Sequence, residues 1–329
     1  MPAVIAPTDL KVGTPQISGP LTVHPLFRGD APGLEYRSFA QAAAEGFVVH
    51  EVEHGGAVND LVVTNPLDVA VMLYDGEEVM GAQQNRTLDT TVLVPAHAQL
   101  TVPVSCVEQG RWEGERNAEG FVPAPQAAYP SLRRMKSAQA TAAAARGGLR
   151  RADQGAVWAE VGAMAERRDA PTATGAMHDV YEHDRASLAE IANGIERADG
   201  QVGAVAVIGG RVAVLDYVSR SDVWAALHGP LVQGYALDAL DNNSRGVPLH
   251  PGELVDQAWV QGWASTMFGI RDVLLRPTVG LGRSIAIDAC GTAATGCVHD
   301  GELVQMTAFP GYDEPVADAT RIRRPSRRR

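Results

Sequence analysis

Short runs of apolar and β-branched residues, separated by turn residues, dominate the chain between residues 19 and 112. Runs of this length and composition are typical of strands. The clearest examples are residues 61–65, 69–74, 90–94 and 100–104. Residues 90–94 and 100–104 are joined by a short turn, so we expect them to pair as a hairpin. One short helix is expected at residues 38–45, because Ser38 can cap its start and Gly46 can end it.

Helical patterns replace the strand pattern in the middle of the chain. Residues 131–146 are rich in good helix formers and stop at Gly147. Residues 153–168 carry apolar positions at helical spacing, and residues 179–195 form a third candidate. We expect these three helices to bridge two β-containing parts.

The last third of the chain alternates strands and helices. Gly209-Gly210 lies between two apolar runs and predicts a tight hairpin. Helices follow at residues 222–240 and 251–268, the second opening with a proline. Three further strands are expected at residues 284–288, 295–299 and 303–309.

This order of elements predicts an α+β fold. The expected N-terminal domain is antiparallel and β-sandwich-like, and the expected C-terminal domain is an antiparallel sheet with helices on one face. The predicted segments are a β-rich domain at 18–125, a helical bridge at 126–198, an α+β domain at 199–312 and a disordered basic tail at 313–329.

Charge narrows the choice of partners. The chain of 329 residues has a net charge of −11, although six arginines lie in its last nine residues. An acidic body argues against a surface that follows nucleic-acid phosphates, so any such contact is expected only through the tail.

No apolar run is long enough to cross a bilayer, and the first ten residues do not resemble a secretory signal. Three cysteines are too few for a disulfide framework, and we expect reduced thiols and a cytoplasmic protein.

The predicted hairpin brings two polar segments together. If the turn centres on residues 96 and 97, the numbers of facing residues add to 193, which places Asn85 opposite Glu108 and Thr87 opposite Cys106. A three-residue turn gives a sum of 194 and places Arg86 opposite Glu108. Residues 84–86, in the polar segment 83–86, would then lie about one strand spacing, roughly 5 Å, from residues 106–108, in the polar segment 106–112.

These segments carry the most varied chemistry in the sequence. Arginines bind phosphate through forked hydrogen bonds, and a tryptophan can stack on a ring. Glu108 is the candidate general acid or base, and Cys106 is a candidate nucleophile. The expected ligand-binding residues are Gln84, Asn85, Arg86, Gln109, Arg111 and Trp112. A structural alternative remains open, in which Cys106 is a small core residue and Arg86 pairs with Glu108 across the strands.

Two other polar groups offer alternatives. The acidic residues at 75, 77 and 78 are interpreted as a solvent-exposed turn, with a divalent-cation site as the competing hypothesis. Four residues at helical spacing could bind a transition metal, although a polar helix face with ion pairs is the simpler interpretation. They are His178, Asp179, Glu182 and His183. No metal site is assigned, and neither a phosphate-binding P-loop nor a Gly-x-Ser-x-Gly nucleophile elbow occurs.

The chain resembles a bacterial family, the ARG and rhodanese-phosphatase-superfamily-associated protein domain. The resemblance is carried by Gln84-Asn85-Arg86 and by residues 103–112, and extends from about residue 18 to Phe309. The family name implies an association with ADP-ribosylglycohydrolases and phosphatases, and so with ADP-ribose or NAD metabolism in bacterial stress or conflict. The resemblance supplies no catalytic residues.

The sequence is therefore compatible with three functions. The first function is the binding of a phosphorylated, nucleotide-like small molecule such as ADP-ribose, which an enzyme would also process. The second is a non-enzymatic scaffold or protein-interaction module. The third is a metal-dependent hydrolase. The sequence indicates a small-molecule partner and no membrane partner, and it identifies neither a cofactor nor an oligomeric state.

Overall fold

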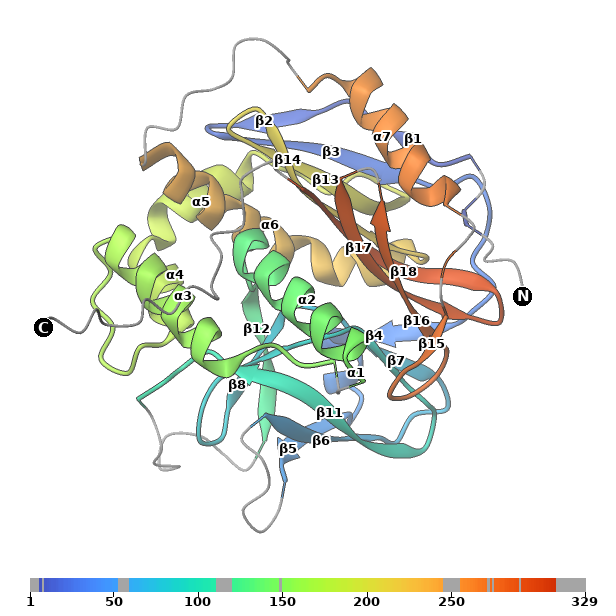
Figure 1. The fold of residues 1–329 in the computed structure, drawn as a ribbon, viewed down its shortest axis with the longest axis horizontal. Coiled ribbons are helices and arrows are strands. Elements are labelled where there is room, and N and C mark those ends of the chain that lie inside the picture. The colour runs from blue at the N-terminus through green and yellow to red at the C-terminus, as the bar shows by residue number, and fades with distance from the viewer. Residues whose placement is uncertain are drawn as a thin grey trace, which may run out of the picture.

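The structure is a computed structural model, and the parts of the chain that it describes are residues 6–7, 9–52, 59–110, 120–147, 150–244, 255–270, 273, 275–289 and 291–311. Helices and mostly antiparallel sheets are packed together, which confirms the α+β class (Figure 1). No helix in these ranges is long and apolar enough to span a membrane.

The strands of the first half are β1 (Lys11–Val12), β2 (Gln16–Ser18), β3 (Leu21–Phe27), β4 (Tyr36–Ser38), β5 (Val48–Glu51), β6 (Asp60–Asn65), β7 (Ala70–Leu73), β8 (Glu77–Gly81), β9 (Arg86–Leu88), β10 (Val92–Val94), β11 (Ala98–Cys106) and β12 (Phe121–Ala127). Those of the second half are β13 (Gln201–Ile208), β14 (Arg211–Val218), β15 (Arg276–Pro277), β16 (Arg283–Ala289), β17 (Thr292–His299) and β18 (Glu302–Pro310). The helices are α1 (Phe39–Ala43), α2 (Pro130–Ala145), α3 (Gln154–Arg167), α4 (Met177–His183), α5 (Arg185–Asn193), α6 (Ser221–Ser244) and α7 (Gln257–Gly269).

The largest sheet has the order β1-β3-β13-β14-β18-β17-β16-β15, with β2 also paired to β3. The expected hairpin around Gly209-Gly210 is present as β13 and β14. Strand β3 comes from the N-terminal segment, yet it pairs along the length of β13, from Leu21 opposite Ile208 to Phe27 opposite Gln201. The first and last thirds of the chain therefore share one sheet.

Helices cover both faces of this sheet, whereas the sequence suggested one. Ala204 of β13 belongs to the same core cluster as Trp224 of α6. The next residue, Val205, belongs to a second cluster with Val260 of α7. Successive strand residues point to opposite faces, and seven of the eight residues of β13 are buried. A strand that is apolar on both sides needs cover on both sides.

Two smaller sheets form the other β layer, in the lower half of Figure 1. Their orders are β12-β8-β9-β11-β6-β5 and β10-β7-β4, and only the β4–β7 pair is parallel. Residues of both sheets and of α1 pack into a third core cluster, which includes Phe39, Val71 and Val104.

The expected hairpin between residues 90–94 and 100–104 is wrong. Strand β10 pairs with β7 instead, with Val92 opposite Leu73. Strand β11 pairs first with β6 and then, from Val104 onward, with β9. The turn at His97 therefore joins two different sheets, and all three residues of β10 are buried between them.

Most helix boundaries agree with the expectations. Ser38 caps α1 in a reciprocal capping box with Gln41, and Asp153 caps α3. The helix expected at 179–195 is divided into α4 and α5 around Asp184. The last helix begins at Gln257 behind the N-cap Asp256, and residue 251 lies outside the described ranges.

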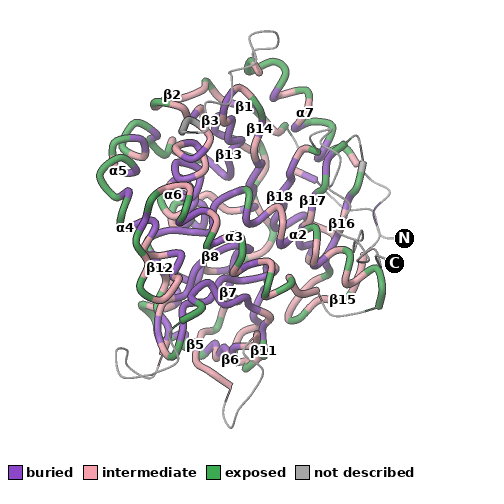
Figure 2. Tube along the Cα trace, turned by 60° about the vertical axis from the view of Figure 1, so that its left-hand side comes forward, coloured by how far each residue is buried: buried purple, intermediate pink, exposed green. Residues whose placement is uncertain are grey.

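Helix α2 fixes the two β layers to each other through buried charge. Its Arg133 donates two hydrogen bonds to the Asp216 carboxylate on β14, at 2.6 and 2.9 Å. Tyr74 and Tyr235 donate to the same carboxylate. One turn later, Lys136 Nζ lies 3.1 Å from Asp89 beside β9. The tube in Figure 2 is mostly purple where these elements meet, as expected for a continuous interior.

Candidate functional site

The two polar segments predicted to converge do so. Arg86 lies opposite Cys106 in the β9–β11 pair, and the Asn85 carbonyl accepts a hydrogen bond from Val107 N at 3.1 Å. The facing residues are shifted from the expected register, since Thr87 lies opposite Ser105 and not opposite Cys106. Convergence is thus confirmed, although it arises from neighbouring strands of one sheet and not from the hairpin.

Three residues that the sequence did not single out for this site join it. Glu78 on β8 and His178 on α4 are linked by Gln126 of β12. The Gln126 amide nitrogen donates to Glu78 Oε2 at 2.7 Å and lies 2.9 Å from His178 Nδ1. We call the following set the polar corner: Glu78, Gln84, Asn85, Arg86, Cys106, Glu108, Gln126 and His178.

Burial raises the pKa of Glu78 to about 8. The hydrogen bond from Gln126 and the nearby Asn85 amide favour the charged form, while the charge of Glu108 opposes it. Glu78 Oε1 has no hydrogen-bond partner among the described residues. Glu78 therefore holds a proton at neutral pH, with one oxygen uncommitted.

Glu108 has the opposite surroundings. Its Oε2 accepts a hydrogen bond from the Asn85 backbone N at 3.1 Å, and its Oε1 accepts one from Thr174 Oγ1 at 2.9 Å. Donors at both oxygens stabilise an ionised carboxylate. The corner thus holds two glutamates, next to the same Asn85, in environments that favour different protonation states.

Cys106 is held as a neutral thiol. Its Sγ lies 3.0 Å from Gln84 Oε1, 3.1 Å from the Glu108 carbonyl oxygen and 3.4 Å from Arg86 Nη1. Burial raises the pKa of the Cys106 thiol, and the positive charge of Arg86 only partly offsets this. The Gln154 side chain bonds to both the N–H and the carbonyl of Cys106, each at 2.8 Å.

The other predicted ligand-binding residues differ in exposure. Arg86 is 1% exposed, and it donates to the Asn85 carbonyl at 3.4 Å and lies 3.7 Å from Glu51. Gln84 is also buried and donates weakly to the carbonyl of Gln109, which is exposed. Arg111 and Trp112 lie outside the described residues.

The corner is also a junction between the β layer and the helical segment. Glu108 forms an isolated bridge with Ala176, and Val107 O accepts from Met177 N at 2.9 Å. Gly110 N donates to Thr174 O at 2.7 Å, and a side chain at Gly110 would crowd the Thr174 backbone. The end of β11 and the start of α4 are therefore fixed to each other.

The acidic group at residues 75–78 is not exposed, as the sequence suggested, because Asp75, Glu77 and Glu78 are all buried. A pair of glutamates inside an apolar run was the signal that could have revealed this. In the described ranges, no three His, Cys, Asp or Glu residues lie close enough together to hold a metal ion, and this holds for the His178–His183 helix too.

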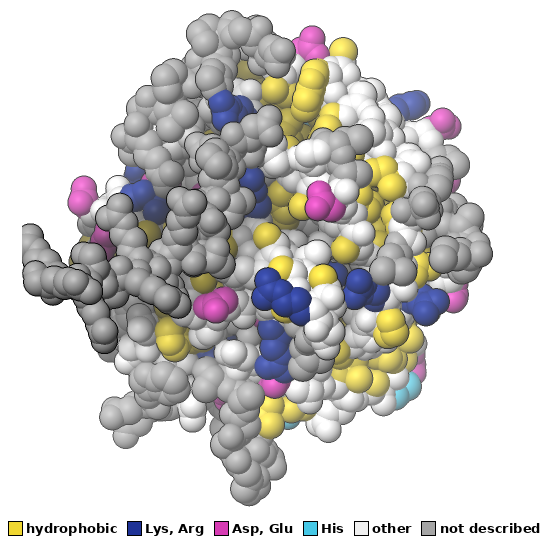
Figure 3. All heavy atoms as spheres, viewed as in Figure 1, with side chains coloured by type: hydrophobic (Ala, Val, Ile, Leu, Met, Phe, Trp, Pro, Cys, Tyr) yellow, Lys and Arg dark blue, Asp and Glu magenta, His cyan; other side chains and the backbone are white. Residues whose placement is uncertain are grey.

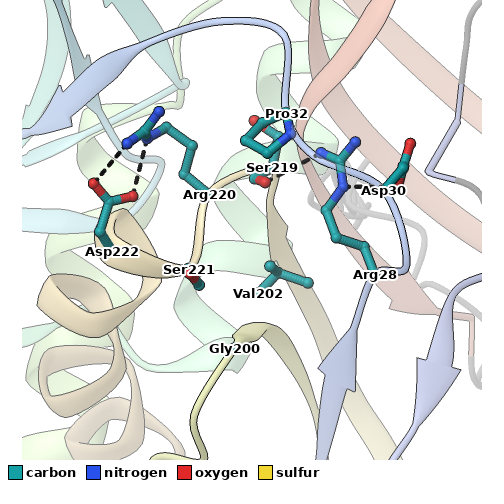
Figure 4. Close-up of a pocket in the computed structure, with 9 residues that line it drawn as sticks. All are labelled: Arg28, Asp30, Pro32, Gly200, Val202, Ser219, Arg220, Ser221 and Asp222. Atoms are coloured by element: carbon teal, nitrogen blue, oxygen red, sulfur yellow. Dashed lines mark hydrogen bonds and ion pairs between the residues drawn. The ribbon is translucent and has the colours of Figure 1, made fainter.

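Two of the cavities on the described surface have volumes of about 630 Å³ each, and no residue of the polar corner lines either of them. The first lies at the start of α6 (Figure 4). Its two arginines are matched by carboxylates, because Arg28 pairs with Asp30 and Glu302, and Arg220 pairs with Asp222. The second cavity lies near the C-terminal end of α2.

No curated protein and no solved structure matches this chain at a significant level. A family model does match, over residues 9–309, and its name links the family to the rhodanese-phosphatase superfamily. Because the match spans most of the chain, this protein belongs to the family of the ARG and Rhodanese-Phosphatase-superfamily-associated Protein domain.

Proposed function

We propose that the protein binds a phosphorylated, nucleotide-like small molecule at the polar corner and processes it by proton transfer. The observation that carries this proposal is the pair of glutamates beside Asn85. Glu78 is protonated at neutral pH, and Glu108 is surrounded by donors that favour its charged form. Enzymes commonly place a general acid and a general base in such contrasting environments.

The corresponding reaction is a hydrolysis. Glu108 takes a proton from the attacking water as the water oxygen bonds to the electrophilic centre. Glu78 gives its proton to the departing group as that bond breaks, so the pair ends with the opposite protonation and is reset by solvent. His178 Nδ1 lies 2.9 Å from the Gln126 side-chain nitrogen, which also donates to Glu78 and so connects the ring to the proposed acid.

The ligand class comes from the resemblance and from the sequence. ADP-ribose or an NAD-related compound is the ligand class that the resemblance described above implies. Arg111 and Trp112, which follow Glu108 by three and four residues, would hold phosphate and stack on a ring. In this proposal the buried Arg86 is a positioning residue that supports Cys106 and balances the carboxylates.

The test uses Glu78→Gln and Glu108→Gln, with the exposed Glu182→Gln on α4 as the matched control. Binding of ADP-ribose and NAD is followed by calorimetry, and turnover by chromatography of the products. We expect binding by all four proteins and a loss of turnover of about 100-fold or more in the two corner variants. Absence of binding and turnover in the unaltered protein at millimolar ligand overturns the proposal.

A second candidate, a non-enzymatic scaffold, is favoured by one specific observation. The corner is tightly hydrogen-bonded to the start of α4, through Glu108, Val107 and Gly110. If this junction is its whole role, Thr174→Val lowers the free energy of unfolding and Glu78→Gln leaves ligand binding and turnover unchanged. A turnover defect in a fully folded Glu78→Gln protein excludes the scaffold.

A further inference from the structure

The second cavity is lined by residues from four separate parts of the chain: Asp60, and residues within 90–103, 144–151 and 276–284. We call it the arginine pocket. Figure 3 shows Lys and Arg side chains gathered over α2 and toward β15.

The pocket carries uncompensated positive charge. Three arginines line it with a single carboxylate, Asp60, which lies 2.5 Å from Arg151 Nη2. Within the described ranges, Arg150 and Arg276 have no carboxylate within ion-pair distance. Among the residues that the structure describes, Arg150 hydrogen-bonds only to Thr141 Oγ1, at 3.5 Å. This contrasts with the cavity at α6, where each arginine has an acidic partner.

The same walls contain buried donors that have no acceptor among the described residues. They are Arg150 Nε, Arg151 Nε and Ser284 Oγ. A buried polar atom without a partner is uncommon, because it loses its hydration without a hydrogen bond in return. All three atoms belong to residues that line the arginine pocket, so a bound oxyanion could become their acceptor after a small shift of these side chains.

Arg150 is also held in an unfavourable place for its charge. Burial lowers the pKa of Arg150, Asp75 opposes this, and the charge of Arg276 lowers it further. Like charges next to each other in a partly buried pocket repel, and a bound anion removes the repulsion. The proximity of Arg150 to Arg276 is thus less unfavourable when an anion is bound than when the pocket is empty.

The C-terminal end of α2 opposes anion binding, but its negative charge is smaller than the positive charge of the arginines. The C-terminal end of α2 presents backbone carbonyls at Ala144, and a helix end carries roughly half a negative charge. Arg276 Nη1 donates to the Ala144 carbonyl at 3.1 Å, which neutralises part of that effect. Three arginines against one aspartate still leave an excess of two positive charges.

We propose that the arginine pocket binds the phosphate group of a small organic phosphate ester. Forked guanidinium donors match a tetrahedral oxyanion, with Arg150, Arg151 and Arg276 around the phosphate and Ser284 Oγ completing the set. Pro103, Pro277 and Val279 add an apolar wall for the organic part. A cavity of about 630 Å³ is in the range of small-molecule sites, and the acidic chain does not favour an extended nucleic acid.

This site is separate from the polar corner. Both lie along β11, but the pocket is lined by Thr101 and Pro103, and the corner begins at Cys106. Three residues of a strand span about 10 Å. The proposal therefore does not rest on the proposed function, and each can fail alone.

The experiment measures binding of inorganic pyrophosphate and of adenosine 5′-monophosphate by calorimetry in low salt. The variants are Arg150→Gln and Ser284→Ala. The control is Arg146→Gln, which removes the same charge from an exposed neighbour that does not line the pocket. We expect Arg150→Gln to weaken binding at least about tenfold, Ser284→Ala to weaken it a few-fold, and Arg146→Gln to leave it nearly unchanged.

A thermal-shift arm separates binding from folding. Without ligand, Arg150→Gln should melt no lower than the unaltered protein, because it relieves repulsion from Arg276. Pyrophosphate should raise the melting temperature of the unaltered protein and of Glu78→Gln equally, and raise that of Arg150→Gln less.

Three results overturn the proposal. One is no binding of either phosphate compound at millimolar concentration. Another is an equal loss in Arg150→Gln and Arg146→Gln, which would show a diffuse surface effect. The third is tighter binding of a single-stranded oligonucleotide that competes with adenosine 5′-monophosphate, which would assign the pocket to nucleic acid.

Discussion

Burial sets the protonation of two side chains of the polar corner, Cys106 and Glu78. Cys106 and Glu78 are almost completely enclosed, and in both the loss of water is the largest influence on the pKa. Both are held with their proton at neutral pH. Glu78 is thereby suited to donate a proton, whereas Cys106 is poorly suited to act as a nucleophile.

We predict that native Cys106 reacts slowly with iodoacetamide at pH 7.5, at least about tenfold more slowly than in the unfolded chain, because the reagent needs an accessible thiolate. Mass spectrometry of the peptide that contains Cys106 measures its alkylation separately from the other cysteines. Native alkylation as fast as in denaturant would contradict the assignment and restore Cys106 as a nucleophile.

Glu78 should also make stability depend on pH. Its pKa is about 4.5 when unfolded and about 8 when folded, so between these values the folded state binds the additional proton. The free energy of unfolding therefore falls as the pH rises through this window. In Glu78→Gln the slope should be shallower by up to about 1.4 kcal/mol per pH unit, the value for one proton.

Urea denaturation at pH 5, 6, 7 and 8 provides this measurement. Glu182→Gln, an exposed change on α4, is the control and should follow the unaltered protein. Glu77 has a pKa raised in the same direction, to about 8, so some slope should remain in Glu78→Gln. An unchanged slope would show that Glu78 is not protonated in the folded state.

Among the secondary-structure elements, α2 depends most on interactions that its own sequence does not reveal. Its composition predicts a helix, and its bounds agree with residues 131–146 to within one residue. The composition does not indicate which of its charged side chains are buried. Arg133 and Lys136 are fully buried, because the carboxylates of Asp216 and Asp89, which lie far away in sequence, meet them.

We predict that Arg133→Met lowers the free energy of unfolding by about 3–5 kcal/mol, because it leaves the buried Asp216 carboxylate without its main counter-charge. Although burial raises the pKa of Asp216, the charge and hydrogen bonds of Arg133 outweigh this and lower it. Arg185→Met, an exposed change on α5, should cost little.

The double variant Arg133→Met/Asp216→Asn tests the cause. It should recover part of the loss, since no uncompensated charge remains, and chemical denaturation of all four proteins gives the coupling energy. If the effects of the two single changes simply add, the ion pair is not the source of the destabilisation.

For the whole molecule, the decisive feature is the sheet that joins the first and last thirds of the chain. Strand β3 lies between β1 and β13, so a segment that begins at residue 199 lacks the partner of its first strand. The Gly280 turn adds a second connection, because Leu281 N donates to Leu93 O on β10, and a side chain at Gly280 would collide with that carbonyl.

We predict that residues 199–329 expressed alone show no cooperative unfolding transition, because β13 would present an unpaired apolar edge. Adding a separately produced fragment of residues 1–198 should restore a cooperative transition, measured by circular dichroism during heating. Cooperative folding of residues 199–329 alone would instead support an independent C-terminal domain with its boundary near residue 199.

The sequence alone determined the features that depend on neighbouring residues. The capping box at Ser38, the hairpin at Gly209-Gly210 and the ends of α2 and α3 are set by local backbone preferences and hydrogen bonds. The convergence of Asn85 with Glu108 was also predicted, but from a hairpin that does not form; it arises because the two segments lie at the ends of the paired strands β9 and β11.

Only the tertiary structure decided which strands pair and which charges are buried. The residues of β10 and β11 suit a hairpin, but β7 and β6 offer better-placed apolar partners from elsewhere in the chain. The protonation of Glu78 and the clustering of Arg150, Arg151 and Arg276 likewise arise from segments far apart in sequence. Burial and long-range charge are properties of the assembled fold, because each depends on which distant segments exclude water from a side chain.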